Sequence, residues 1–250
     1  MPQELLRVAN ITKRFGGVTA LEDVSLEVHE GEVLCLVGEN GSGKSTLIKI
    51  ISGVYAADEG DIYINDHHYT RLTPLQSMRE GVQVIYQDFS LFPNLTVAEN
   101  IAVNEMLSTG KLLVDWHEVN RIAEEALNKI GVAIPLDVDA GTLSTADRQL
   151  IAIAKAILAK ARLIIMDEPT TALTHKEVAA LFKVIDDLKQ QGISTIFVSH
   201  KLQEVREIAE RTIILRNGKK VLDQEAADLD VKTIEYYMTG REIDTSSIDY

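Results

Sequence analysis

Val33-Leu34-Cys35-Leu36-Val37-Gly38-Glu39-Asn40-Gly41-Ser42-Gly43-Lys44-Ser45-Thr46 is the stretch that decides the fold of this chain. Its first five residues are an unbroken apolar run, which is typical of a strand buried on both faces of a sheet. The next nine fit the pattern G-x-x-x-x-G-K-[ST], and residues 47–52 continue as a helical run. A strand, a glycine-rich loop and a helix in this order predict a phosphate-binding loop rather than a plain glycine turn.

The residue types of this loop suit a triphosphate. Gly41 and Gly43 let the backbone curl, so that successive N–H groups and the positive end of the new helix point at a phosphate. Lys44 adds a positive charge that reaches the β- and γ-phosphates, and Ser45 offers a hydroxyl oxygen to Mg²⁺. We expect the phosphates to be held by Gly38, Glu39, Asn40, Gly41, Ser42, Gly43, Lys44, Ser45 and Thr46.

Three further apolar runs, at residues 82–86, 163–166 and 193–198, predict more buried strands. Helical patterns lie between them, the clearest over residues 174–191, and Gly192 is placed to end that helix. Strands that alternate with helices predict an α/β fold with a parallel, helix-covered sheet.

Residues 24–28 alternate apolar and polar side chains, which predicts a half-exposed strand, and residues 62–64 predict another. Residues 212–216 and 219–222, joined by Asn217-Gly218, predict a hairpin of the same kind. We expect these segments to form a smaller antiparallel layer beside the parallel core.

A helical pattern dominates from about residue 89 to residue 160 and predicts a helical subdomain inserted into a nucleotide-binding domain of residues 1–240. Thr96, Asp115 and Ser144 are the expected helix caps, since each precedes an acidic residue by three positions. Residues 241–250 are polar and aperiodic, which predicts a tail or linker.

The composition limits the function further. The 250 residues hold 25 Lys and Arg against 38 Asp and Glu, a formal net charge of −13 that repels nucleic acid and anionic lipid. We therefore expect no nucleic-acid partner. The single cysteine, Cys35, excludes an intrachain disulfide, and no apolar run reaches the about 18 residues of a membrane span. We expect a cytosolic chain whose membrane spans, if it works at a membrane, belong to other chains.

Two carboxylates follow the run 163–166 directly, at the end of a strand where ligands of open α/β sheets gather. We expect Asp167 to hold Mg²⁺ and Glu168 to orient and deprotonate the water that attacks the γ-phosphate. Gln87 and His200 also follow predicted strands. Gln87 is a candidate for the metal or the attacking water, and His200 for the γ-phosphate; each is otherwise a surface or structural residue.

Together these motifs resemble the ATP-binding-cassette ATPases over nearly the whole chain. They match the family in order: the phosphate loop 38–46, Q-loop Gln87, signature Leu143-Ser144-Thr145-Ala146-Asp147, acidic strand end Asp167-Glu168, D-loop Ala172-Leu173-Thr174 and switch His200. The resemblance implies a P-loop NTPase core with a helical subdomain, ATP and Mg²⁺ as cofactors, and adenine stacked on Phe15.

The resemblance also implies partners. Two such domains pair head to tail, so that Ser144, Thr145 and Ala146 meet ATP held by the phosphate loop of a second nucleotide-binding domain. The helical subdomain binds transmembrane permease subunits at the cytoplasmic face of the membrane.

Two departures from the usual family pattern indicate which group of the family this chain resembles. The signature has Thr145, Ala146 and Asp147 in place of two glycines and a glutamine, and the D-loop has Thr174 in place of an aspartate. Both resemble the first cassette of bacterial monosaccharide importers, which implies indirect work with a sugar-binding protein outside the membrane. The alternatives are a soluble cassette ATPase acting on DNA or ribosomes, and a regulatory cassette with weak hydrolysis.

Overall fold

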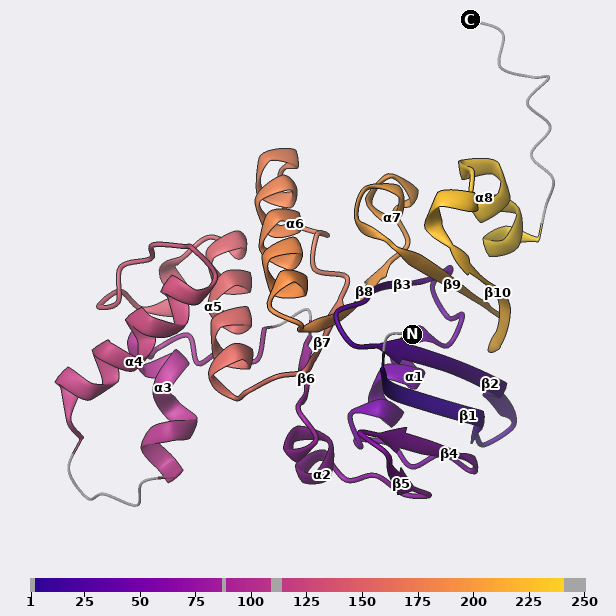
Figure 1. The fold of residues 1–250 in the computed structure, drawn as a ribbon, viewed down its shortest axis with the longest axis horizontal. Coiled ribbons are helices and arrows are strands. Elements are labelled where there is room, and N and C mark those ends of the chain that lie inside the picture. Colours follow the sequence, from indigo (N-terminus) through magenta and orange to yellow (C-terminus); the bar gives the residue numbers. More distant parts are fainter. Residues whose placement is uncertain (1–2, 87–88, 109–113, 241–250) are drawn as a thin grey trace, which may run out of the picture.

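The computed structural model describes residues 3–86, 89–108 and 114–240. Its main sheet has the strand order β10-β9-β3-β8-β7-β6 (Figure 1). These strands are β3 (Val33–Val37), β6 (Val82–Ile85), β7 (Leu163–Asp167), β8 (Ser194–Ser199), β9 (Arg211–Arg216) and β10 (Lys219–Glu225). The parallel pairing of β6, β7, β8, β3 and β9 confirms the predicted parallel core.

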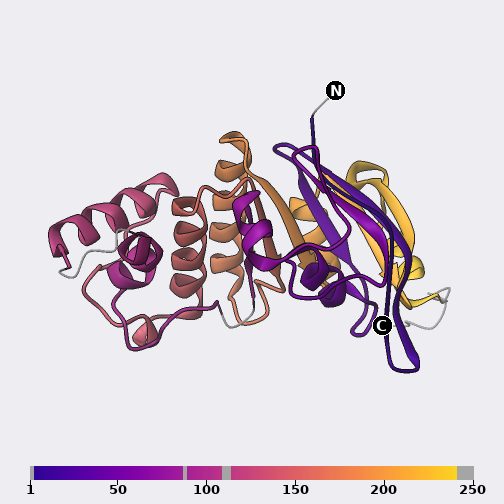
Figure 2. The same cartoon turned by 90° about the horizontal axis from the view of Figure 1, so that it is seen from below.

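A second, antiparallel sheet has the order β2-β1-β4-β5. Its strands are β1 (Glu4–Phe15), β2 (Val18–His29), β4 (Glu59–Ile64) and β5 (His67–Tyr69). This sheet lies against one side of the main sheet (Figure 2). It confirms the predicted antiparallel layer.

One assignment to that layer is wrong. The hairpin of β9 and β10 forms as predicted, but β9 pairs in parallel with β3 and belongs to the main sheet. Thr212, Ile213, Ile214 and Leu215 are all buried, because both faces of β9 are covered. The prediction of a half-exposed strand was wrong, because a half-exposed strand alternates buried and exposed residues, and β9 instead has four consecutive buried residues.

The helices are α1 (Lys44–Ile51), α2 (Pro74–Arg79), α3 (Val97–Ser108), α4 (Trp116–Lys129), α5 (Thr145–Leu158), α6 (His175–Gln190), α7 (Leu202–Ile208) and α8 (Val231–Thr239). Two short 3₁₀ turns, Ala140–Thr142 and Ala226–Asp228, connect elements. Thr96, Asp115 and Ser144 cap α3, α4 and α5 through their side chains, as the sequence predicts.

Strand β3 shows why its sequence is an unbroken apolar run. Val33, Cys35 and Val37 pack into the core under α5, α6 and α7, whereas Leu34 and Leu36 pack into the core shared with α1 and the antiparallel sheet. Successive side chains of a strand point to opposite faces, so a sheet covered on both sides needs apolar residues at every position. Cys35 is a free, fully buried thiol, and burial raises its pKa.

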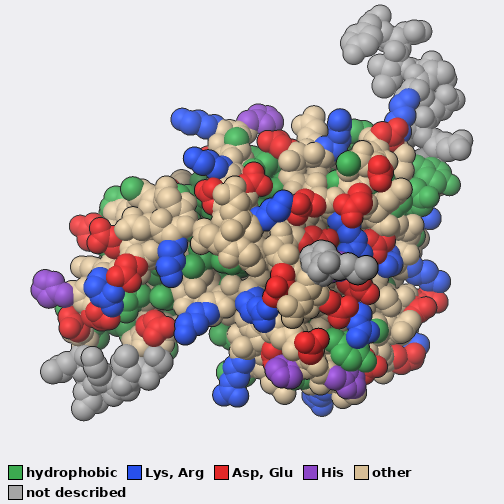
Figure 3. Space-filling view, viewed as in Figure 1, with side chains coloured by type: hydrophobic (Ala, Val, Ile, Leu, Met, Phe, Trp, Pro, Cys, Tyr) green, Lys and Arg blue, Asp and Glu red, His purple; other side chains and the backbone are tan. Residues whose placement is uncertain are grey.

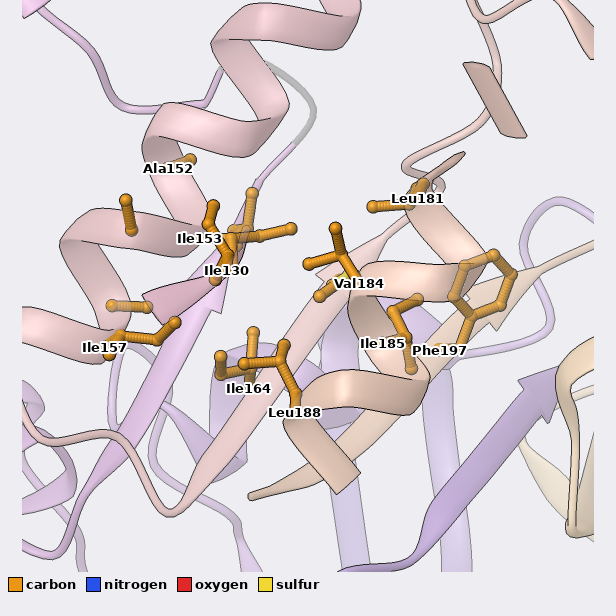
Figure 4. Packing of buried hydrophobic residues seen from close by; sticks show 14 of the residues in the cluster. Ile130, Ala152, Ile153, Ile157, Ile164, Leu181, Val184, Ile185, Leu188 and Phe197 are labelled. Carbon is orange, nitrogen blue, oxygen red and sulfur yellow. The ribbon is translucent and has the colours of Figure 1, made fainter. Parts of the chain in front are cut away.

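The segment with α3, α4 and α5 lies at the β6 edge of the main sheet (Figure 1). Figure 4 shows Ile157 of α5 and Leu188 of α6 on either side of Ile164 of β7, all buried in one core. Burying one such side chain is worth roughly 1.5–3 kcal/mol. This packing fixes α5 relative to the strand that ends in Asp167.

Within the described ranges, no helix combines the length and apolar character that crossing a membrane requires. Gln87 and the predicted tail 241–250 lie outside the described residues.

Candidate functional site

The loop between β3 and α1 has the geometry that its glycines predict. Gly43 is the residue before α1 and has φ +108°, a left-handed conformation that residues with side chains avoid. A Cβ atom at Gly43 would lie 2.8 Å from the carbonyl oxygen of Ala20 and 2.7 Å from Leu21 Cδ2. The loop is therefore packed tightly against the start of β2, which fixes the direction of its backbone N–H groups.

Lys44 is buried at the first turn of α1, with 5% of its surface exposed. Its ammonium group donates hydrogen bonds to the carbonyl oxygens of Gly38 (2.7 Å) and Glu39 (3.0 Å). Burial lowers the pKa of Lys44, while the nearby charges of Glu168 and Asp167 raise it. The lysine and both acids thus lie within electrostatic reach of one another, as one shared nucleotide site requires.

A cavity of about 430 Å³ opens over this loop. The residues that line it are Val18, Thr19, Ala20, Asn40, Gly41, Gly43, Lys44, Ser45, Thr46, Glu168, Asn217 and Gly218. Its volume falls within the usual range for small-ligand sites, about 300–1,000 Å³.

The turn between β9 and β10 forms a wall of this cavity that the sequence analysis did not identify. Gly218 donates its N–H to the carbonyl oxygen of Ser42 (3.0 Å) and accepts from the N–H of Glu22 (2.8 Å). Asn217-Gly218 predicts a turn from its residue types. No local signal indicates its packing against the loop and β2.

The two acids at the end of β7 have different surroundings. Burial and the charge of Glu168 raise the pKa of Asp167, and Lys44 and Lys49 oppose that rise. The Glu168 carboxylate accepts a hydrogen bond from His200, whose Nδ1 lies 3.1 Å from Oε1 of the acid. The pair can polarise a water molecule at the cavity, since Glu168 lines it directly.

The backbone of Glu168 is strained. Its φ is +50°, although it carries a side chain, and its N–H donates to the carbonyl oxygen of Val198 at 3.1 Å. Such a conformation costs of order 1–3 kcal/mol and persists only where the surroundings hold it. The Glu168 side chain lines the same cavity as Lys44 and Ser45 of the phosphate loop.

The structure brings together residues 38–46, Asp167, Glu168 and His200. Phe15 is 43% exposed and pairs across the antiparallel sheet with Val18, a residue of the cavity wall. Its ring packs edge-on against Tyr55 with centroids 5.3 Å apart. Phe15 thus presents part of its surface at the rim of the site.

Ser144, Thr145 and Ala146 are not part of the cavity lining within the described chain. They lie at the start of α5, which Figure 1 places on the opposite side of β6 and β7 from α1. The Ser144 hydroxyl donates to the Asp147 carboxylate (2.8 Å) and accepts from the Asp147 N–H (3.1 Å). The acid therefore turns toward the serine and fixes its hydroxyl.

The donor set fits a magnesium nucleotide. Ser45 and the Asp167 carboxylate supply hard oxygen atoms beside the phosphate loop. Among the residues that the structure describes, the buried Ser42 hydroxyl has no hydrogen-bond partner. The described residues contain no cluster of three or more His, Cys, Asp or Glu for a metal. Mg²⁺ suits a site of this kind, because it binds through one or two protein oxygens plus phosphates.

A glycine-rich loop between a buried strand and a helix, facing two acids at the end of a neighbouring strand, defines the P-loop NTPase fold class. The chain belongs to the ABC transporter family, whose model matches residues 21–171.

A curated relative is the ribose import ATP-binding protein RbsA 2 of Rubrobacter xylanophilus. It is 43% identical over 238 residues, which are 95% of this chain and 46% of the relative. The chain thus spans about half the length of the curated relatives it matches.

Solved structures agree with the fold. The ATP-binding cassette MJ1267 of an ABC transporter, in its ADP conformation, superposes with a TM-score of 0.82 at 28% identity, covering 95% of this chain and 99% of that one. The cassette MJ0796, dimeric and bound to ADP and Pi, gives a TM-score of 0.76 at 26% identity, covering 89% and 99%.

Proposed function

We propose that this chain binds ATP with Mg²⁺ and hydrolyses it to energise the import of a monosaccharide through a membrane permease. The observation that supports the proposal most is that Glu168, hydrogen-bonded to His200, lines the same cavity as Lys44 and Ser45. The names of the relatives support ATP as the nucleotide and a sugar such as ribose as the cargo.

The proposed binding roles follow from position. The N–H groups of residues 38–46 and the Lys44 ammonium bind the phosphates, and the half-exposed ring of Phe15 stacks with adenine. Ser45 and Asp167 hold the metal, with Gln87 proposed as a further ligand. Bound Mg²⁺ would neutralise charge on the β- and γ-phosphates.

The proposed catalytic step is water attack on the γ-phosphorus, which breaks its bond to the β,γ-bridging oxygen and releases ADP and phosphate. Glu168 orients the water and accepts its proton, and His200 fixes the carboxylate through the 3.1 Å contact and meets the γ-phosphate. Gln87 lies beside the attacking water in this proposal. Phosphoryl transfer needs mainly positioning and charge stabilisation, which these residues supply.

The proposed partners follow from the separation between α5 and the cavity. Ser144, Thr145 and Ala146 serve a second nucleotide-binding domain in a head-to-tail dimer, which the dimeric state of MJ0796 supports. The segment 89–160 binds the permease subunits, and a sugar-binding protein delivers the cargo on the far side. The chain would then lie at the cytoplasmic face of the membrane, and residues 1–240 would be one nucleotide-binding domain.

A role on DNA or ribosomes is less well supported. The face shown in Figure 3 intersperses lysines and arginines with acidic side chains instead of gathering them into a stripe, and the net charge is −13. Polyanion binding requires a concentrated basic surface. The proposed role also differs from a purely regulatory cassette, since Glu168 and His200 form the hydrolytic pair.

Replacing the acid without changing its shape tests the proposal. We expect Glu168→Gln to bind ATP as the wild type does but to lose at least about 100-fold in kcat, because the amide cannot accept a proton. Phosphate release gives the rate and calorimetry gives the affinity. Unchanged turnover in the variant would remove Glu168 from this role, and a wild-type chain without activity would remove the proposed hydrolysis.

A further inference from the structure

A hydrogen-bond network, buried at Ser199 and Glu204 and half-exposed at Lys201, links the residues on both sides of His200. The Ser199 hydroxyl donates to Glu204 Oε2 (2.8 Å) and accepts from the backbone N–H of Lys201 (3.0 Å). The Glu204 side chain is only 8% exposed, and its Oε1 lies 3.1 Å from the Lys201 ammonium. A carboxylate at such depth is costly without partners, so the network holds together as a unit.

Lys201 also reaches the loop that carries Glu168. Its ammonium nitrogen lies 3.0 Å from the carbonyl oxygen of Thr170 and 3.4 Å from the Thr170 hydroxyl. Thr170 is buried and follows Glu168 by two residues. A single ammonium group therefore joins the start of α7, the Glu204 carboxylate and the backbone of the acidic loop. Hydrogen bonds from a charged donor are stronger than those between neutral groups.

The loop requires such a restraint, because Glu168 occupies a left-handed backbone conformation that is unfavourable for its side chain. The bond from its N–H to Val198 holds the residue from β8. The bond from Lys201 to Thr170 holds the loop from α7. The contact between Glu168 and His200 lies between these two attachments.

We propose that Lys201 is a positioning residue, which holds the loop of Glu168 at the distance from His200 that water activation needs. The inference rests on the proposed function. Lys201 does not line the cavity in the described part of the chain, so it acts through the loop and not on the nucleotide. Misplacement of a reacting group by about 1 Å can lower a rate by up to about 100-fold, so the loss of one attachment is measurable.

Lys201→Met tests the inference, because it keeps the apolar stem and removes the ammonium. We expect kcat for ATP to fall about tenfold, while KM and the calorimetric affinity for ATP stay within about twofold. Lys201→Arg keeps a charged donor and should restore at least about half of the wild-type kcat. The control is Lys189→Met, which removes an ion pair between the part-exposed side chains of Lys189 and Glu210 away from the site and should leave kcat unchanged.

A second variant separates the loop contact from the charge of Glu204. Lys201→Met combined with Glu204→Gln leaves no unpaired buried carboxylate, so it should fold with near wild-type circular dichroism and keep the low kcat. Recovery of kcat in this double variant would overturn the inference. Three other results would also overturn it. Lys201→Met could keep the wild-type kcat, or lose kcat and ATP affinity equally. Lys201→Arg could fail to restore kcat.

The experiments distinguish a failure of the proposed function from a failure of the role proposed for Lys201. If Glu168→Gln abolishes hydrolysis but Lys201→Met is fully active, only the role of Lys201 is wrong. If the wild-type chain binds ATP without hydrolysing it, both proposals fall.

Discussion

Burial shifts the pKa values of two charged residues of the site. The pKa of Asp167 is raised, first by burial and then by the charge of Glu168, and burial lowers the pKa of Lys44. Acids and bases with perturbed pKa values cluster at functional sites. A Mg²⁺ ion and a triphosphate would neutralise these charges together.

The raised pKa of Asp167 predicts a gain of stability on its removal. An acid with a raised folded pKa contributes stability that is complete below its unfolded value, 3.8, and is lost as the pH rises through the folded value. At pH 7, therefore, ionised Asp167 disfavours the folded state. We expect Asp167→Asn to raise Tm at pH 7 without nucleotide, and to raise it by less as the pH falls toward 4. Scanning calorimetry at several pH values measures this, and a gain that grows at low pH would contradict it.

Helix ends are the elements that the sequence defines best. Thr174 caps α6: its hydroxyl accepts from the N–H of Glu177 (3.4 Å), and its own N–H donates to the Glu177 carboxylate (2.7 Å). We expect Thr174→Ala to lower the free energy of unfolding by about 1 kcal/mol in urea, and Thr174→Ser to lower it by much less. Equal stability of the alanine variant and the wild type would show that α6 does not depend on this cap.

The sequence predicts that strands form, but it does not predict which distant segments they pair with. The buried runs became β3, β6, β7 and β8 because burial on both faces requires apolar residues throughout. Strand β9 was placed in the wrong sheet because strand pairing is decided by distant parts of the chain. For the same reason the wall formed by Gly218 and Ala20, and the link from Lys201 to Thr170, could not be predicted. The strand, glycine-rich loop and helix of residues 33–51 could be predicted, because their determinants are contiguous in the sequence. Phosphate binding by this loop stays a prediction.

At the scale of the whole molecule, the phosphate loop and the proposed signature segment lie apart. Ser144 starts α5, on the other side of β6 and β7 from the phosphate loop (Figures 1 and 2). ATP that contacts both segments must therefore bridge two molecules, and it would stabilise the pair by its differential affinity. Hydrolysis would release them.

This separation predicts ATP-dependent association. We expect Glu168→Gln with Mg²⁺ and ATP to sediment as a dimer, and the same variant with ADP to remain a monomer. In the proposed dimer, the Asp147 carboxylate, which accepts a hydrogen bond from Ser144, would place a negative charge near the incoming phosphate and weaken association. Asp147→Gln should lower the dimer dissociation constant several-fold. A dimer of equal strength with ADP and ATP would contradict a bridging role for the γ-phosphate.

The central claim is that a triphosphate binds over the loop that begins α1. Isothermal titration calorimetry of the wild-type chain with ATP and Mg²⁺ tests it most directly, with Lys44→Ala as the matched variant. We predict saturable binding with one site per chain, and at least about tenfold weaker binding in the variant, which loses the charge that faces the β- and γ-phosphates. No saturable binding by the wild type, or equal affinity in the two proteins, would contradict the account.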